Sequence, residues 1–213
     1  MITITGMRPE EIEKKSYQLI EERVPHHSFT PQEWAIVKRM IHATADFDLA
    51  DKVRFHPNAI TEGIKALRRG APIITDTKMV KVGIARISLQ NYKTKILCAI
   101  SQRKVIGEAR ASGRTRASVA MEKLSSFLEG SIVAIGNAPT ALVEILALSR
   151  QGALTPALII GVPVGLVGAK ESKNMLMEQS IPYITVQGEK GGSPLAVSII
   201  NSLALLTLEG SDG

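Results

Sequence analysis

The chain carries Ser131-Ile132-Val133-Ala134-Ile135-Gly136-Asn137-Ala138-Pro139-Thr140, an apolar run followed at once by a turn and a proline. Short apolar runs of this kind are typical of strands covered on both faces of a parallel sheet. Pro139 suits the first turn of a helix, because that position needs no backbone N–H for a helical hydrogen bond. These residues therefore predict a strand, a turn and a helix in succession, which is the repeating unit of an α/β fold.

Short apolar runs alternate with longer amphipathic segments on both sides of these residues. The expected strands are residues 71–76, 95–101, 131–136, 157–161 and 183–187. The expected helices are residues 77–82, 112–128, 139–150, 169–179 and 192–206. We therefore expect a three-layer, doubly wound α/β domain around a mostly parallel five-stranded sheet.

Residues 1–70 carry helix signals and no strand signal that we recognise. Pro9, followed by two glutamates, predicts a helix that runs to about Val24. Thr30-Pro31-Gln32-Glu33 is a capping box with proline at the first helical position, and it predicts a second helix to about Ala45. A third helix is expected between residues 58 and 70. The chain is thus predicted to be a single domain, 1–213, with a helical region at 1–70 attached to an α/β core at 71–208.

The charge balance favours an anionic partner. The chain has 213 residues, a formal net charge of +6 and a pI near 9.5. It has only four Phe, three Tyr and one Trp for stacking on bases, and we expect no basic helix, so nucleic acid is the weaker option. The apolar stretch 154–169 is too short for a membrane span. The lone Cys98 indicates a reducing compartment, and we expect a cytoplasmic location.

Several catalytic signatures are missing from the sequence. It has no HExxH or CxxC spacing for a metal, no GxGxxG or GxxxxGK[ST] for a nucleotide, and no GxSxG for a serine hydrolase. We expect no structural metal and no cofactor.

Three glycine-rich loops follow expected strands, at residues 136–140, 161–168 and 187–193. In open α/β sheets, ligands bind beyond the carboxyl ends of the strands, where helix N-termini present free amides. Each loop alone is explained by a plain turn, whereas three loops at one edge indicate an anion site. The candidate binding residues in these loops are Gly136, Asn137, Ala138, Thr140, Gly191, Gly192 and Ser193.

His42 is the histidine with a specific functional interpretation. On a helical wheel, Trp34, Val37, Ile41 and Ala45 form the expected buried stripe, and Lys38, Arg39 and His42 lie together on another flank. This flank is either a solvated basic face or a proton-donor site. Two adjacent cations disfavour the protonated imidazole and a docked polyanion favours it, so the histidine would become a donor when substrate binds.

Two further candidates have alternatives of their own. Ser16 interrupts the apolar stripe of the first helix, so its hydroxyl either bonds the backbone four residues earlier or touches a ligand. Arg114 and Arg116, at the start of an expected helix, form either a carboxylate clamp or a basic surface turn.

These residues stand in long motifs that resemble the precorrin-8X and cobalt-precorrin-8 methylmutase family of cobalamin biosynthesis. The motifs are Arg39-Met40-Ile41-His42-Ala43, Gly70-Ala71-Pro72-Ile73 with Asp76 and Met79-Val80, Val133 to Leu142, Gly161-Val162-Pro163-Val164-Gly165 with Val167-Gly168-Ala169 and Glu171-Ser172-Lys173, and Gly191-Gly192-Ser193. The resemblance extends from Ser16 to Leu206.

The resemblance implies an isomerase that moves a methyl group from C-11 to C-12 of a corrinoid, giving hydrogenobyrinate or cobyrinate. It implies a flavodoxin-like or Rossmann-like fold, a homodimer and an active site at the subunit interface. The family's catalytic histidine corresponds to His42, and its substrate contacts correspond to Ser16 and Arg39. Arg116 corresponds to an arginine near the ligand, although Arg114 departs from the usual pattern before it.

Two questions stay open at this point. A non-catalytic corrinoid or nucleotide carrier could use the same basic face and loops. The sequence also leaves open whether the substrate is metal-free or contains cobalt, and which ring atom His42 protonates.

Overall fold

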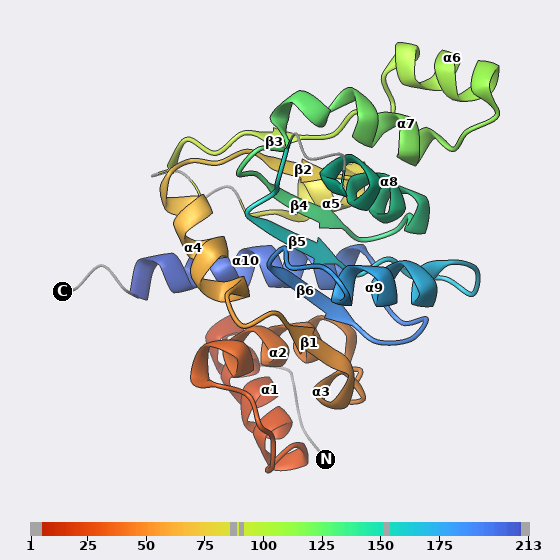
Figure 1. The fold of residues 1–213 in the computed structure, drawn as a ribbon. Coiled ribbons are helices and arrows are strands. Elements are labelled where there is room, and N and C mark those ends of the chain that lie inside the picture. Colours follow the sequence, from red (N-terminus) through yellow and green to blue (C-terminus); the bar gives the residue numbers. More distant parts are fainter. Residues whose placement is uncertain (1–5, 86–88, 90–91, 151–153, 210–213) are drawn as a thin grey trace.

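Strands and helices alternate from residue 53 to the C-terminal helix (Figure 1). The computed structural model of the chain describes residues 6–85, 89, 92–150 and 154–209. Its helices are α1 Pro9–Arg23, α2 Pro31–Thr44, α3 Leu49–Lys52, α4 Ala59–Arg68, α5 Lys78–Gly83, α6 Arg103–Ser112, α7 Arg116–Lys123, α8 Pro139–Arg150, α9 Ala169–Met177 and α10 Ser193–Glu209. Its strands are β1 Val53–Phe55, β2 Ile73–Thr75, β3 Ile96–Leu97, β4 Ile132–Ile135, β5 Leu158–Gly161 and β6 Tyr183–Val186.

Within the described ranges, six strands form one sheet in the order β1-β6-β5-β4-β2-β3. Every pair is parallel except β1 with β6, which is antiparallel. When the parallel strands β2 to β6 are renumbered 1 to 5 along the chain, their spatial order is 2-1-3-4-5, which is that of a common doubly wound sheet. In that order the chain changes direction between β2 and β4, and their carboxyl ends are therefore the expected place for a ligand.

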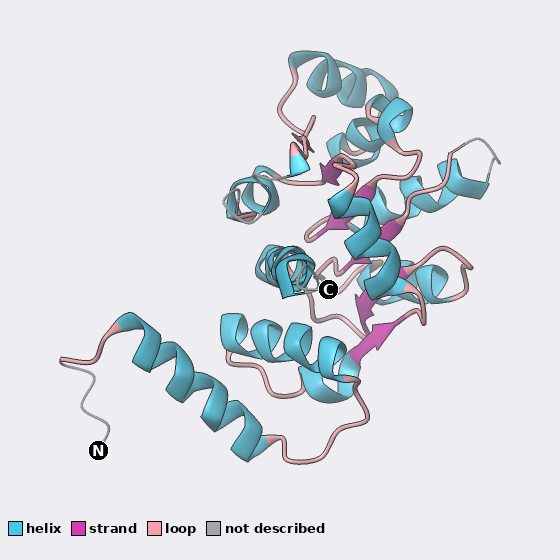
Figure 2. Cartoon of the chain, turned by 90° about the vertical axis from the view of Figure 1, so that its left-hand side faces the viewer, coloured by secondary structure: helices cyan, strands magenta, loops and turns pink. Residues whose placement is uncertain are grey.

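Alternate residues of the central strands face opposite layers of helices. Ile73, Ile132 and Leu158 belong to a core shared with α2, α4 and α10. Their neighbours Ile74, Val133 and Ile159 belong to a second core shared with α6, α7, α8 and α9. Figure 2 shows the two sets of helices on either side of the strands. This burial on both faces explains why the central strands are almost continuously apolar.

The expectation of a five-stranded sheet was wrong, because the region 1–70 contributes the strand β1. Val53 and Arg54 of β1 pair with Val186 and Thr185 of β6. The strand is three residues long and follows α3 without a break, so it leaves no alternating pattern in the sequence. The same region is tied to the core by α2, which packs against α10. Residues 1–70 therefore complete the sheet and one helical layer.

The helix expected at 112–128 is confirmed only in part, because α7 spans Arg116–Lys123 and a short 3-10 turn follows at Ser125–Phe127. Gly113, with φ at +68°, ends α6, and Thr115 then caps α7 by accepting a hydrogen bond from the Ser118 amide at 3.2 Å. Helix α6 lies in a segment for which we expected no helix, and it carries Arg103, Lys104 and Arg110. The absence of a basic helix therefore no longer argues against nucleic acid, whereas the scarcity of aromatic residues still does.

Two smaller expectations also failed. Ala45 is not part of the buried stripe of α2, because it caps the helix in the left-handed conformation, with φ at 55°, and is exposed. The strand expected at 95–101 is reduced to the two residues of β3, at the edge of the sheet. Among the described residues, no helix is long and apolar enough to span a membrane.

Candidate functional site

A cavity that contains several predicted site residues lies at the carboxyl ends of β2 and β4, and we call it the switch-point cavity. Its volume is about 610 Å³, within the usual range for ligand pockets of about 300–1,000 Å³. It is lined by Asp76, Thr77, Ile100, Thr115, Arg116, Ala117, Asn137, Ala138, Pro139, Thr140 and Val164. Four predicted binding residues thus lie together where the strand order predicts a ligand.

The floor of this cavity is organised by Asp76, a fully buried carboxylate one residue beyond β2. The Gly136 amide donates to its Oδ1 at 3.0 Å, and the Asn137 and Ala138 amides donate to its Oδ2 at 2.8 Å. Burial raises the pKa of the Asp76 carboxyl, and the three backbone donors oppose that effect.

This contact changes the predicted role of Gly136, Asn137 and Ala138. We expected their backbone amides to bind an anionic ligand, but the amides donate to the carboxylate of Asp76. Asn137 and Ala138 still line the cavity, so a ligand would contact their side chains and not their backbone amides. Sequence reasoning gave Asp76 no role, although its position at the end of a strand was a usable signal.

The three glycine-rich loops do meet at one edge of the sheet, as predicted. A Cβ on Gly136 would lie 2.8 Å from the Cα of Ser193, and one on Gly191 would collide with the carbonyl oxygens of Val162 and Pro163. The Gly192 amide donates to Val162 at 2.8 Å. Gly191, Gly192 and Ser193 are not among the residues that line the switch-point cavity, so they hold the loops together beside it.

Helix α7 brings hydroxyl groups and a cation to the wall of the cavity. The Thr115 hydroxyl donates to the Thr140 hydroxyl at 2.8 Å, which joins the starts of α7 and α8. Arg116 is exposed, and within the described part of the chain its side chain has no ion pair or hydrogen bond. It is therefore free to bind an anionic group of a ligand.

Arg114 does not form the clamp that we considered. Its guanidinium group bonds Glu122 at 2.5 Å and Glu144 at 2.9 Å, and these carboxylates raise its pKa. The alternative interpretation as a basic surface turn is closer to the structure.

His42 lies in a different cavity, between α1 and α2, with a volume of about 280 Å³. The predicted capping box that starts α2 is confirmed: the Glu33 amide donates to the Thr30 hydroxyl at 3.3 Å, and the Thr30 amide donates to the Glu33 carboxylate at 2.8 Å. Near the other end of α2, His42 is exposed, and its ring lies 5.4 Å from that of Tyr17. The cavity is lined by Ser16, Leu19, Ile20, Arg23, Ile41, His42, Ala45 and Phe47.

The cations expected beside His42 bind carboxylates of α1. Lys38 pairs with Glu21 at 2.7 Å, and Arg39 lies 3.7 Å from Glu13. An incoming polyanion would therefore have to compete with Glu13 for Arg39. The backbone interpretation of Ser16 is confirmed, because its hydroxyl donates to the Ile12 carbonyl at 2.8 Å. Ser16 also lines the His42 cavity, and its contact with a ligand stays a prediction.

The two cavities have no lining residue in common. The loop 187–193 connects the residues around the His42 cavity with those around the switch-point cavity. The Lys190 ammonium bonds Asp46 at 2.9 Å and Asp48 at 2.8 Å, just beyond the end of α2. The fully buried Lys173, whose pKa burial lowers to about 8, donates to the Lys190 carbonyl at 2.6 Å. One chain thus fixes both groups of predicted residues without placing them in one pocket.

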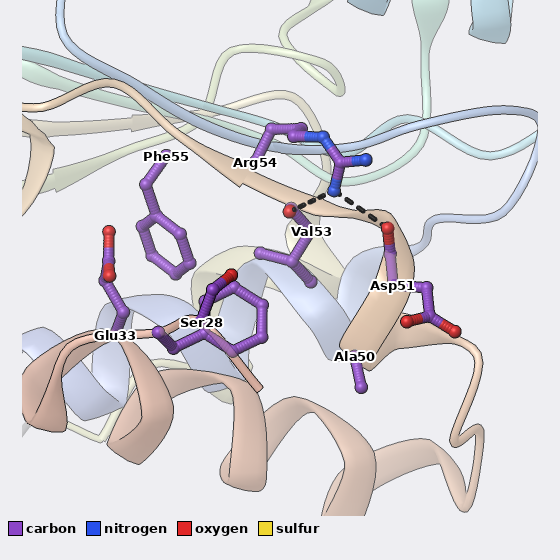
Figure 3. Close-up of a pocket in the computed structure, with 8 residues that line it drawn as sticks. Ser28, Glu33, Ala50, Asp51, Val53, Arg54 and Phe55 are labelled. Atoms are coloured by element: carbon purple, nitrogen blue, oxygen red, sulfur yellow. Dashed lines mark hydrogen bonds between the residues drawn. The ribbon is translucent and has the colours of Figure 1, made fainter. Parts of the chain in front are cut away.

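A third cavity, of about 420 Å³, lies between the start of α2 and the edge strand β1 (Figure 3). It contains no predicted site residue. Its arginine, Arg54, donates to the carbonyl oxygens of Asp51 and Val53, both at 2.8 Å, and is therefore engaged by the protein itself. Across the parts of the chain that the structure describes, no group of three or more His, Cys, Asp or Glu side chains could hold a metal ion.

The sheet order and the switch-point cavity define a doubly wound α/β protein with a cavity beyond the carboxyl ends of its strands. The chain belongs to the precorrin-8X methylmutase family, which matches residues 11–206. The members of this family are isomerases of cobalamin biosynthesis that move a methyl group within their substrate.

Individual relatives agree with this assignment. The chain is 48% identical over 204 residues to a cobalt-precorrin-8 methylmutase of Leptospira interrogans, covering 92% of this chain and 93% of that protein. It is 45% identical over 168 residues to a precorrin-8X methylmutase of Pseudomonas aeruginosa, covering 78% and 80%. The fold is similar to a crystal structure of precorrin-8X methylmutase from Thermus thermophilus, with a TM-score of 0.85 and 38% identity over 93% of this chain and 98% of that one.

Proposed function

We propose that this protein moves the methyl group at C-11 of cobalt-precorrin-8 to C-12, with His42 as the general acid. The family assignment supports the reaction, and the 48% identical relative is named for the cobalt-containing substrate. The observation that carries the role of His42 is its exposure in a cavity that Ser16 also lines, at the end of a capped, well-packed helix. A rigid helix presenting one titratable side chain suits proton transfer.

The proposed reaction requires few catalytic groups. A methyl shift within one conjugated ring system needs no nucleophile and no electron transfer, so we propose that the enzyme uses no cofactor and that cobalt enters as part of the substrate. Protonation of the ring lowers the barrier and favours the conjugation of the product, and one positioned acid contributes about 10²- to 10⁴-fold. Since cobalt occupies the inner nitrogens, His42 would donate its proton at the periphery of the ring.

We further propose a homodimer whose active site combines two copies, with His42 of one copy facing the switch-point cavity of the other. The His42 cavity, at about 280 Å³, is smaller than the usual range for ligand pockets and cannot enclose a macrocycle alone. The switch-point cavity is larger but lacks an imidazole among its lining residues. Beside it, Leu166 and Val167 are 91% and 89% exposed, which suits a surface that a second copy covers.

In this assembly the carboxylates of the macrocycle bind Arg116 in the switch-point cavity, and Ser16 and Arg39 on the facing copy. Asn137, Ala138 and Thr140 shape the cavity, and Gly136, Gly191, Gly192 and Ser193 maintain the loops around it. The net charge of +6 supports a substrate with many carboxylates. We place the reaction in the cytoplasm, with which the lone Cys98 agrees.

The test is a visible absorption assay with purified protein and cobalt-precorrin-8. We expect conversion to the spectrum of the corrin product, and we expect His42→Asn to bind substrate while its turnover falls by about 10²- to 10⁴-fold. His26→Asn is the matched control, because His26 is exposed in a loop and lines none of the cavities described above. Binding by the wild-type protein without conversion would support the carrier hypothesis instead. Full activity of His42→Asn would remove the acid from the mechanism.

A further inference from the structure

The proposed function assigns no role to helix α6. It lies at the margin of the molecule beyond α7 (Figure 1), and it packs against α7. Its buried residues are Val105 and Ala109, and its exposed residues include Arg103, Lys104 and Arg110. A helix held by so small an apolar stripe, with so many exposed cations, suggests a role in binding an anion.

A cavity of about 260 Å³ lies between α6 and the start of α7, and we call it the arginine cavity. Its walls are Ile106, Ala109, Arg110, Arg114 and Arg116. Three arginines therefore line it, and none of its lining residues is acidic.

The three arginines differ in how their charge is balanced. Arg114 is neutralised by Glu122 and Glu144, both outside the cavity lining. Arg110 and Arg116, by contrast, have neither an ion pair nor a side-chain hydrogen bond within the described residues. Two uncompensated guanidinium groups on one cavity repel each other, and a carboxylate between them would remove the repulsion and accept paired N–H bonds.

Arg116 also lines the switch-point cavity, so the two cavities share this side chain as a wall. A macrocycle in the switch-point cavity would direct a peripheral arm past Arg116 toward Arg110. The apolar side chain of Ile106 and the methyl group of Ala109 would contact the methylene groups of that arm.

We propose that the arginine cavity is a carboxylate subsite in which Arg110 binds a peripheral carboxylate of the macrocyclic substrate. This proposal rests on the proposed function for the identity of the ligand. It assigns Arg110 to substrate affinity and specificity, and it assigns Arg110 no part in the chemical step.

The experiment compares Arg110→Gln with Arg103→Gln, since both residues are exposed cations on α6 and only Arg110 lines the cavity. Dissociation constants are measured by absorbance titration with two probes, a corrin with free peripheral carboxylates and the same corrin with those carboxylates converted to amides. We expect Arg110→Gln to weaken binding of the carboxylate form by about 10- to 100-fold, as for loss of a hydrogen-bonded ion pair. Its affinity for the amide form, and both affinities of Arg103→Gln, should match those of the wild-type protein.

Equal behaviour of the two variants would overturn the subsite while leaving the proposed function intact, provided that the wild-type protein still converts its substrate. If the wild-type protein binds both corrin probes but does not convert cobalt-precorrin-8, that result would instead contradict the proposed reaction, and the Arg110 comparison would still decide the subsite. Tight binding of a DNA duplex, weakened alike by both substitutions, would identify α6 as a general basic surface and overturn the proposal.

Discussion

Replacement of Asp76 by Asn should destabilise the protein, because the buried carboxylate accepts three backbone hydrogen bonds. An Asn side chain has one oxygen, and its best placement keeps the Asn137 and Ala138 amides bonded at the position of Oδ2. Its NH₂ group would then face the Gly136 amide, which now donates to Oδ1 at 3.0 Å. Two donors would be left without an acceptor, and each buried unsatisfied group costs about 1–3 kcal/mol.

Part of this cost is offset, because the neutral amide avoids the burial penalty that raises the pKa of Asp76. We expect a net loss of about 1–3 kcal/mol in the free energy of unfolding, measured by urea denaturation at a fixed protein concentration. Asp76→Ala should lose more, since all three amides lose their acceptor. Asp51→Asn, at an exposed carboxylate, should stay within about 0.5 kcal/mol of the wild-type protein. Equal stability of Asp76→Asn and Asp51→Asn would refute the assignment of Asp76 as the organiser of the loop.

Three further predictions concern other parts of the fold. The free energy of unfolding should rise by at most about 3 kcal/mol between about pH 8 and pH 10.5, because burial lowers the folded-state pKa of Lys173 to about 8 and the unfolded chain keeps the proton to higher pH. Urea denaturation of Lys173→Met should show no such rise, and parallel pH profiles of the variant and the wild-type protein would contradict this. Gly191→Ala should lower the free energy of unfolding by about 2 kcal/mol or more, because the new methyl group would collide with two carbonyl oxygens, whereas Gly107→Ala, in open space within α6, should raise it by about 0.5–1 kcal/mol. Thermal unfolding measures both, and an unchanged stability of Gly191→Ala would be evidence against the close packing of the loops. Ser16→Ala should raise KM several-fold while leaving stability within about 0.5 kcal/mol, and an unchanged KM would leave Ser16 with only its bond to the Ile12 carbonyl.

The elements predicted well are those whose signals are local. Helix α2 was expected at 31–45 and spans Pro31–Thr44, because its proline and capping box act within four residues of its start. Helix α8 was expected at 139–150 and spans Pro139–Arg150. The central strands were found because burial on both faces makes them continuously apolar.

The elements missed carry weak local signals and depend on packing or pairing with other elements. Strand β1 exists because Val53–Phe55 pair with β6, more than a hundred residues later, and three residues are too few to show a period. Helix α6 has only a narrow apolar stripe and depends on α7 for its packing.

The same limit applies to the site. Its loops could be located from glycines that follow strands, because that rule concerns neighbouring residues. The capture of the Gly136, Asn137 and Ala138 amides by Asp76 joins segments 60 or more residues apart, and nothing in either segment alone predicts it. The separation of His42 from the switch-point cavity is likewise a property of the folded chain.

The most direct test of the account is complementation between two impaired chains. His42→Asn and Arg116→Glu are co-expressed with different tags, and mixed dimers are isolated by two affinity steps and assayed for the methyl shift. If each active site takes His42 from one copy and Arg116 from the other, a mixed dimer contains one intact site and should show about half of wild-type activity, although each variant alone is impaired. Mixed dimers as inactive as the two parent variants would contradict the account.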